Sequence, residues 1–78
     1  MELRKLLETL DDNQYVDICF GVDRNNVPKT VYCGRAKVLL ESKTVLSGFE
    51  NYSVRQIAAY MADIDGDQWV FVQIILEN

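Results

Sequence analysis

The chain has 78 residues, of which 49% are hydrophobic, with 12 acidic and 8 basic side chains and no histidine. This length gives one small domain with a modest core, and the apolar content is too high for a disordered chain. The net charge of −4 argues against a nucleic-acid-binding surface, and the lack of histidine removes the commonest general base and metal ligand. We expect a single domain over residues 1–78 that acts by binding another molecule and is not an enzyme.

Four leucines near the N-terminus repeat at helical spacing, at positions 3, 6, 7 and 10. This spacing predicts an amphipathic helix over residues 2–10. Charged residues interrupt the leucines, so the segment lacks the apolar run of a secretory signal. No later apolar run is long enough for a transmembrane helix. We therefore expect a cytoplasmic protein without a membrane partner.

Two segments after this helix have the composition of strands. Residues 15–20 alternate apolar and polar, and residues 27–33 are rich in β-branched and aromatic residues. Turn-forming residues fill the segment 21–26 between them. The sequence thus predicts an antiparallel hairpin.

The two cysteines lie one in each of these strands. Alternation places Cys19 opposite the core-facing Val16 and Ile18, while Cys33 is assigned to the core face together with Val31. Side chains on opposite faces of a sheet cannot form a disulfide. We expect two free cysteines, with Cys33 in the core and Cys19 partly exposed.

The second half predicts a short helix over residues 35–41, a polar connector over 42–51 and a strand over 68–76. Residues 52–62 fit either a helical stripe or a strand. We favour a strand, because the turn sequence Asp65-Gly66 predicts a hairpin that needs a preceding partner. The expected order is α-β-β-α-β-β, an α+β fold with an antiparallel sheet and two short helices.

Three aspartates surround the predicted turn, namely Asp63, Asp65 and Asp67. A calcium loop beginning at Asp63 needs glycine at position 68 and glutamate at position 74, and the chain has Gln68 and Ile74 there. We favour a hairpin turn with solvated carboxylates. Because no phosphate-binding glycine loop or catalytic grouping of side chains is present either, we expect no metal, no cofactor and no small-molecule substrate.

The last strand is apolar on both faces, with Trp69, Phe71 and Ile75 on the face opposite Val70 and Ile74. If both helices cover one face of the sheet, the other exposes these side chains, joined by Tyr60 and Tyr32, as a contact surface. If the helices cover opposite faces, the strand is wholly buried. The sequence favours neither alternative over the other.

The order of these segments is similar to that of small, acidic proteins encoded by phages, prophages and mobile elements of Gram-positive bacteria and their gut relatives. The similarity runs from the leucines of the first helix through residues 12–18 and 32–42 to residues 52–57 and the closing strand. It implies an α-β-β-α-β-β fold and a cytosolic setting, and no activity. By association alone, it suggests an inhibitor of a host defence protein.

Two functional hypotheses follow from the residues. In the first, the apolar face with Tyr60, Trp69, Phe71 and Ile75 contacts a partner protein, and Asp63, Asp65 and Asp67 steer the chain to a basic surface. In the second, the same face or an exposed edge strand forms a homodimer that buries Trp69 and Phe71.

Overall fold

The computed structural model describes residues 1–49 and 51–77. Its elements in chain order are α1 (Leu3–Thr9), β1 (Tyr15–Val22), β2 (Pro28–Arg35), α2 (Ala36–Glu41), α3 (Lys43–Leu46), β3 (Ser53–Ile64) and β4 (Asp67–Glu77). The α+β class and the predicted order are confirmed. The connector contains one additional helical turn, α3, because Leu46 packs into the core and is only 1% exposed.

The four strands form one sheet in the order β2-β1-β4-β3. Both hairpins are antiparallel as predicted, but the central pair, β1 and β4, is parallel, so the sheet is mixed and not wholly antiparallel. The buried hydrophobic side chains of the described strands all belong to β1 and β4, which take the interior positions, where both faces of a strand are best buried.

Residues 52–62 fall almost entirely within β3, which confirms the strand over the helical alternative. The hairpin closes through Asp65 and Gly66, whose φ angles are 52° and 89°. Positive φ at both central residues is what a two-residue type I′ turn requires. The Asp63 carboxylate accepts a hydrogen bond from the Gly66 N–H at 3.1 Å and holds the turn.

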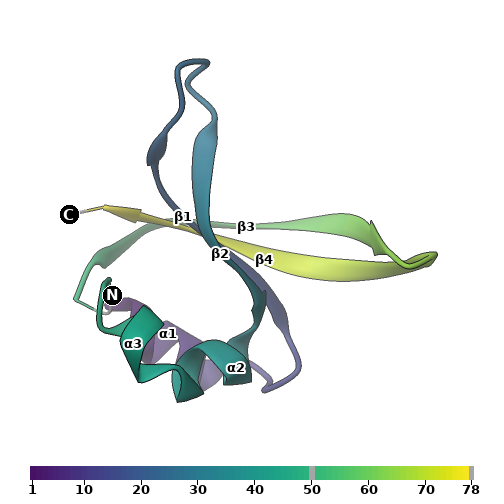
Figure 1. Ribbon diagram of the computed structural model, residues 1–78, viewed down its shortest axis with the longest axis horizontal. Coiled ribbons are helices and arrows are strands. Elements are labelled where there is room, and N and C mark those ends of the chain that lie inside the picture. The colour runs from purple at the N-terminus through teal and green to yellow at the C-terminus, as the bar shows by residue number, and fades with distance from the viewer. Residues whose placement is uncertain (50, 78) are drawn as a thin grey trace.

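All three helices lie on one face of the sheet (Figure 1). One continuous core joins leucines of α1, α2 and α3 to Val16 and Ile18 of β1 and to Ile74 and Leu76 of β4. This arrangement overturns the alternative in which helices cover both faces. None of the helices in the described residues is long and apolar enough to cross a membrane.

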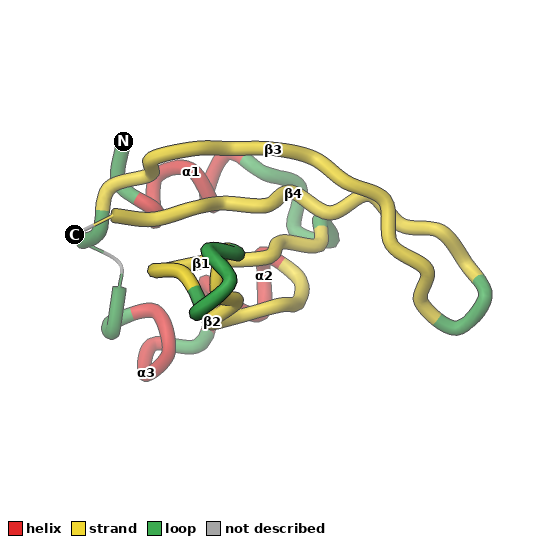
Figure 2. The backbone as a smooth tube through the Cα atoms, turned by 90° about the horizontal axis from the view of Figure 1, so that it is seen from above, coloured by secondary structure: helices red, strands yellow, loops and turns green. Residues whose placement is uncertain are grey.

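The β3–β4 hairpin projects beyond the rest of the sheet (Figure 2). Strand β1 pairs with β4 only from Phe71 to Leu76, while β3 pairs with β4 along its whole length. The end of the hairpin is therefore a two-stranded ribbon without a helix beneath it, and Met61 and Val70 are 62% and 50% exposed there.

The cysteines are free, as predicted, but their predicted positions are wrong. Cys19 is fully buried and Cys33 is exposed. The register pairs Tyr32 with Ile18 and Cys33 with Asp17, so Tyr32 faces the helices and Cys33 faces away from them. The larger Tyr32 ring, and not Val31, supplies the apolar contact that β2 makes with the core.

Candidate functional site

Within residues 1–49 and 51–77, no helix covers the face of the sheet opposite α1, α2 and α3, and we call it the uncovered face (Figure 1). The strand pairing assigns to it alternate residues of all four strands. They are Tyr15, Asp17, Cys19, Thr30, Cys33, Arg35, Gln56, Ala58, Tyr60, Ala62, Ile64, Asp67, Trp69, Phe71, Gln73 and Ile75. Such a face is usually polar in a sheet with one solvated side, so its aromatic content sets it apart.

Four aromatic rings form a continuous cluster across this face. The centroid of Tyr15 lies 5.4 Å from that of Trp69 and 5.2 Å from that of Phe71, and Phe71 stacks on Tyr60 at 5.4 Å. Phe71 is only 4% exposed between its two neighbours, whereas Trp69 and Tyr60 are 42% and 37% exposed. Phe71 therefore supports the cluster, and Trp69 and Tyr60 present it to solvent.

One positively charged side chain of the chain itself already contacts the aromatic cluster. The guanidinium of Arg35 lies over the Tyr15 ring, 5.6 Å from its centroid. A cation at this distance is attracted by the electron-rich face of the ring. This contact is an example, within the chain, of the cation–π attraction that a basic side chain of a partner would find on this surface.

The Asp17 carboxylate lies at the centre of the uncovered face and is 7% exposed. It accepts hydrogen bonds from Thr30 Oγ1 at 2.8 Å and from the Tyr60 hydroxyl at 2.9 Å. The Tyr60 side chain reaches over β4 to make this contact, since β4 separates β3 from β1. Hydrogen bonds to a buried carboxylate are stronger than those between neutral groups, so Asp17 fixes the Tyr60 ring against Phe71.

Replacing Tyr60 by phenylalanine removes this donor and keeps the ring. We expect Y60F to lower the free energy of unfolding by about 1 kcal/mol at neutral pH. Burial, and then the bond to Asp17, raise the pKa of Tyr60 above its ordinary value, because an ionised phenol could not donate. The stabilising contribution is therefore complete below the unfolded-state pKa of about 10 and is lost as the pH rises above it.

Urea titrations of wild type and Y60F between pH 7 and pH 11 measure this contribution. The difference in stability between the two proteins should shrink above about pH 10. A difference that is zero at pH 7, or that does not change with pH, would show that the hydroxyl is not held by Asp17.

Neither cysteine on this face has the surroundings of a reactive thiol. Burial, and then the Asp17 charge, raise the pKa of Cys19 above its ordinary value, and the same two causes act on Cys33. Both groups are thus protonated thiols at neutral pH, and the thiolate is the nucleophilic form. Cys19 Sγ lies 3.6 Å from Asp17 Oδ1 and serves as a weak donor within the packed face.

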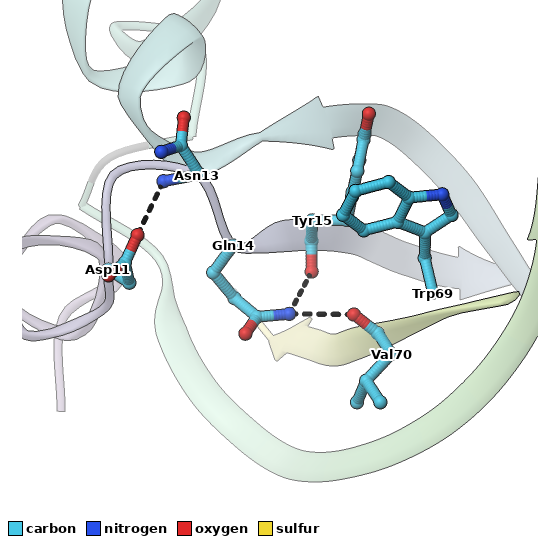
Figure 3. A pocket seen from close by; sticks show the side chains of 6 residues that line it. All are labelled: Asp11, Asn13, Gln14, Tyr15, Trp69 and Val70. Carbon is cyan, nitrogen blue, oxygen red and sulfur yellow. Dashed lines mark hydrogen bonds between the residues drawn. The ribbon is translucent and has the colours of Figure 1, made fainter. Parts of the chain in front are cut away.

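A shallow pocket of about 360 Å³ opens beside Trp69 where β1 begins (Figure 3). Tyr15 and Trp69 form its aromatic wall, and Asp11, Asn13, Gln14 and Val70 complete it. The Gln14 side-chain amide donates to the carbonyl oxygens of Tyr15 and Val70 and ties the two strands together at the point where their pairing ends. The pocket combines ring faces with the Asp11 carboxylate, which suits a positively charged side chain.

The three aspartates of the β3–β4 turn lie at the tip of the projecting hairpin, all exposed. Within residues 1–49 and 51–77, no group of three or more acidic, histidine or cysteine side chains is placed to hold a metal ion. Asp67 belongs to the same face of β4 as Trp69, two residues along the strand. The turn therefore brings negative charge to the edge of the aromatic cluster.

The structure gathers Tyr60, Trp69, Phe71 and Ile75 on one face, and the aspartates at the end of the same hairpin. The expected place of Tyr32 on that face is wrong, because Tyr32 pairs with Ile18 and packs against the core beneath the helices. Sequence reasoning missed Tyr15, Asp17 and the residues lining the pocket as parts of this site. The signal for Asp17 was present, since a carboxylate between Val16 and Ile18 interrupts an otherwise apolar strand. No model of a known protein family, no curated protein and no solved structure matches the chain.

Proposed function

We propose that this chain is a non-enzymatic protein-binding module, whose uncovered face contacts a basic surface of a partner protein. The observation that carries the proposal is the aromatic cluster on a bare sheet face, with Trp69 and Tyr60 exposed around a buried Phe71. Exposed aromatic residues supported by a packed neighbour are typical of the residues that dominate binding energy.

The charges around the cluster indicate the chemistry of the partner. Residues 40–78 hold six acidic residues against Lys43 and Arg55, so the whole net charge of −4 belongs to the second half. A basic partner would be steered to the hairpin tip, and a lysine or arginine would enter the pocket between Trp69 and Asp11. The Arg35–Tyr15 contact is an internal example of that interaction.

The resemblance that the order of segments suggests, to small acidic proteins of phages and mobile elements, motivates a narrower proposal. In it, the chain acts in the bacterial cytoplasm and inhibits a host defence protein whose basic surface it occupies. The negative charge at the hairpin tip, beside an aromatic face, suits a competitor for a positively charged site. Neither form of the proposal calls for a cofactor, a nucleic acid, a membrane or a small-molecule substrate.

The steering charges are tested with the double variant Asp65→Asn/Asp67→Asn. Asparagine keeps the shape of both side chains and tolerates the positive φ at position 65, and Asp63 is left to hold the turn. We expect the variant to retain proteins from a Gram-positive cell extract about tenfold less well than wild type at low salt. Wild-type retention should also fall steeply as salt is added.

The matched control is Asp23→Asn, which removes an exposed charge from the other hairpin, and an asparagine there keeps an oxygen that can accept the loop N–H groups. Retention by this control should equal that of wild type. Equal retention by the Asp65/Asp67 variant at every salt concentration would refute the electrostatic part of the proposal.

A further inference from the structure

One glutamine side chain fixes the polar character of the pocket beside Trp69. Gln14 Nε2 donates to the carbonyl oxygens of Tyr15 at 3.0 Å and of Val70 at 2.7 Å. Both hydrogens of this nitrogen are used in that way, so the amide cannot turn to offer a donor to a ligand. The Gln14 side-chain oxygen is thereby directed away from the Val70 carbonyl (Figure 3). Among the described residues, no donor binds this oxygen.

Asp11 supplies a second acceptor, and this one is charged. Its Oδ1 atom accepts the Asn13 N–H at 2.9 Å, and its other oxygen accepts no hydrogen bond from the described residues. The exposed carboxylate forms no ion pair within that part of the chain. The Asn13 side chain points away from the Gln14 amide (Figure 3). The pocket therefore offers one charged and one neutral acceptor to a ligand that carries N–H donors.

Trp69 is the aromatic ring of the pocket that remains open to a ligand. The planes of Tyr15 and Trp69 meet at 70°, with the ring centroids 5.4 Å apart, so the two rings contact each other and enclose no space between them. The Arg35 guanidinium already lies over Tyr15, and its charge opposes a second cation there. Trp69 is 42% exposed, and Val70, which is 50% exposed, adds apolar surface to the same pocket.

We infer that this pocket selects an arginine side chain of the partner over a lysine, with Gln14 as the specificity-determining residue. A guanidinium is planar and carries five donors, so it can lie on the Trp69 ring while its edge donates to Gln14 and Asp11. The aliphatic stem of the arginine packs on Val70. The inference rests on the proposed function, which supplies the basic partner.

Other cationic groups satisfy this pocket less well. A lysine ammonium is a compact, strongly hydrated charge that can reach the Asp11 carboxylate but does not stack flat on an aromatic ring. A trimethylated lysine has no N–H, so its binding would leave the Asp11 and Gln14 oxygens without donors. It would also find one open ring where quaternary ammonium groups are usually held in an aromatic cage.

Two capped tripeptides, glycine-arginine-glycine and glycine-lysine-glycine, test the selectivity. Each carries one positive charge, so the difference between them measures the head group alone. Nuclear magnetic resonance titrations follow the indole N–H of Trp69, the only tryptophan of the chain. We expect the arginine peptide to bind about three- to tenfold more tightly, the effect of one additional hydrogen bond.

Three outcomes of these titrations would overturn the inference. The first is equal or tighter binding of the lysine peptide. The second is tighter binding of a trimethyl-lysine peptide than of the arginine peptide, which would assign the pocket to a quaternary ammonium group. The third is the absence of a shift with either peptide at its highest soluble concentration.

The variant Gln14→Met tests the role of the glutamine, because it keeps the length of the side chain and removes the acceptor. Its affinity for the arginine peptide should fall to that for the lysine peptide, which should not change. Asp11→Asn should weaken both peptides by a similar factor, and Asp23→Asn, on the β1–β2 hairpin, should weaken neither. An arginine preference that persists in a folded Gln14→Met variant would overturn the inference.

A second readout covers the case in which Gln14→Met fails to fold, since Gln14 ties β1 to β4. In the wild-type protein, the side-chain amide signals of Gln14 should shift when the arginine peptide is added and hold their positions with the lysine peptide. Equal shifts with both peptides would overturn the inference.

The peptides reach the pocket without any partner, so this test and that of the proposed function can fail separately. Equal peptide affinities together with Trp69-dependent retention of partners would refute the arginine selectivity alone. An arginine preference together with partner retention that does not change in Trp69→Ala would refute the proposed function and leave the selectivity as a property of the pocket.

Discussion

Replacing Ile74 by alanine should lower the free energy of unfolding by about 3–4 kcal/mol, a large share of the stability of a domain of this size. Ile74 lies in the central strand β4, is fully buried and packs in the core beneath the helices. Deleting its side chain leaves a cavity that the surrounding leucines cannot close. Urea unfolding followed by circular dichroism measures the loss.

The neighbouring residue is the matched control. Ile75 has the same side chain and the same strand but points to the uncovered face, where it is only partly buried. Ile75→Ala should cost about 1–2 kcal/mol, because its side chain is only partly buried and its loss leaves no closed cavity. Equal losses for the two variants would mean that both faces of β4 are covered, contrary to the one-sided helix layer.

Truncating Trp69 to alanine should weaken partner binding by about 30-fold or more, the effect expected for a central aromatic anchor. Trp69 is the most exposed ring of the cluster and also lines the pocket beside Asp11. Its loss removes the ring that a basic side chain would contact and one wall of that pocket. Quantitative retention from a Gram-positive cell extract by the immobilised chain measures the change.

Val38 provides the control for this variant. It is 55% exposed on α2, in the helix layer on the other side of the sheet. Val38→Ala should retain partners as wild type does, and Trp69→Ala should keep its fold because Trp69 is 42% exposed and lies outside the core beneath the helices. Loss of retention with Val38→Ala and not with Trp69→Ala would move the contact surface to the helices.

The local features of this fold were predictable because neighbouring residues determine them. The leucine spacing gave α1, and the Asp65-Gly66 turn identified β3 as a strand although Ala58, Ala59 and Met61 favour a helix. A two-residue turn requires a strand on each side, and that requirement outweighs helix propensity.

Strand order and the facing of β2 were not predictable, because they depend on packing between distant segments. Nothing local indicates that β1 and β4 lie side by side and parallel. The prediction assigned the side chains of β2 to the wrong faces, because Val31 and Cys33 are as apolar as Tyr32. Only the pairing of Tyr32 with Ile18 shows which side chain faces the core. The Tyr60–Asp17 bond joins residues 43 positions apart and reaches across an intervening strand.

Trp69 is the only tryptophan of the chain, so its fluorescence reports on the uncovered face alone. Acrylamide quenching of the free protein, followed by quenching after addition of the proteins that it retains, tests most directly whether this face is an open contact surface. Ready quenching at all protein concentrations, with protection when the partner is added, is the predicted result. Protection of Trp69 in the free protein, or no change when the partner binds, would contradict the account.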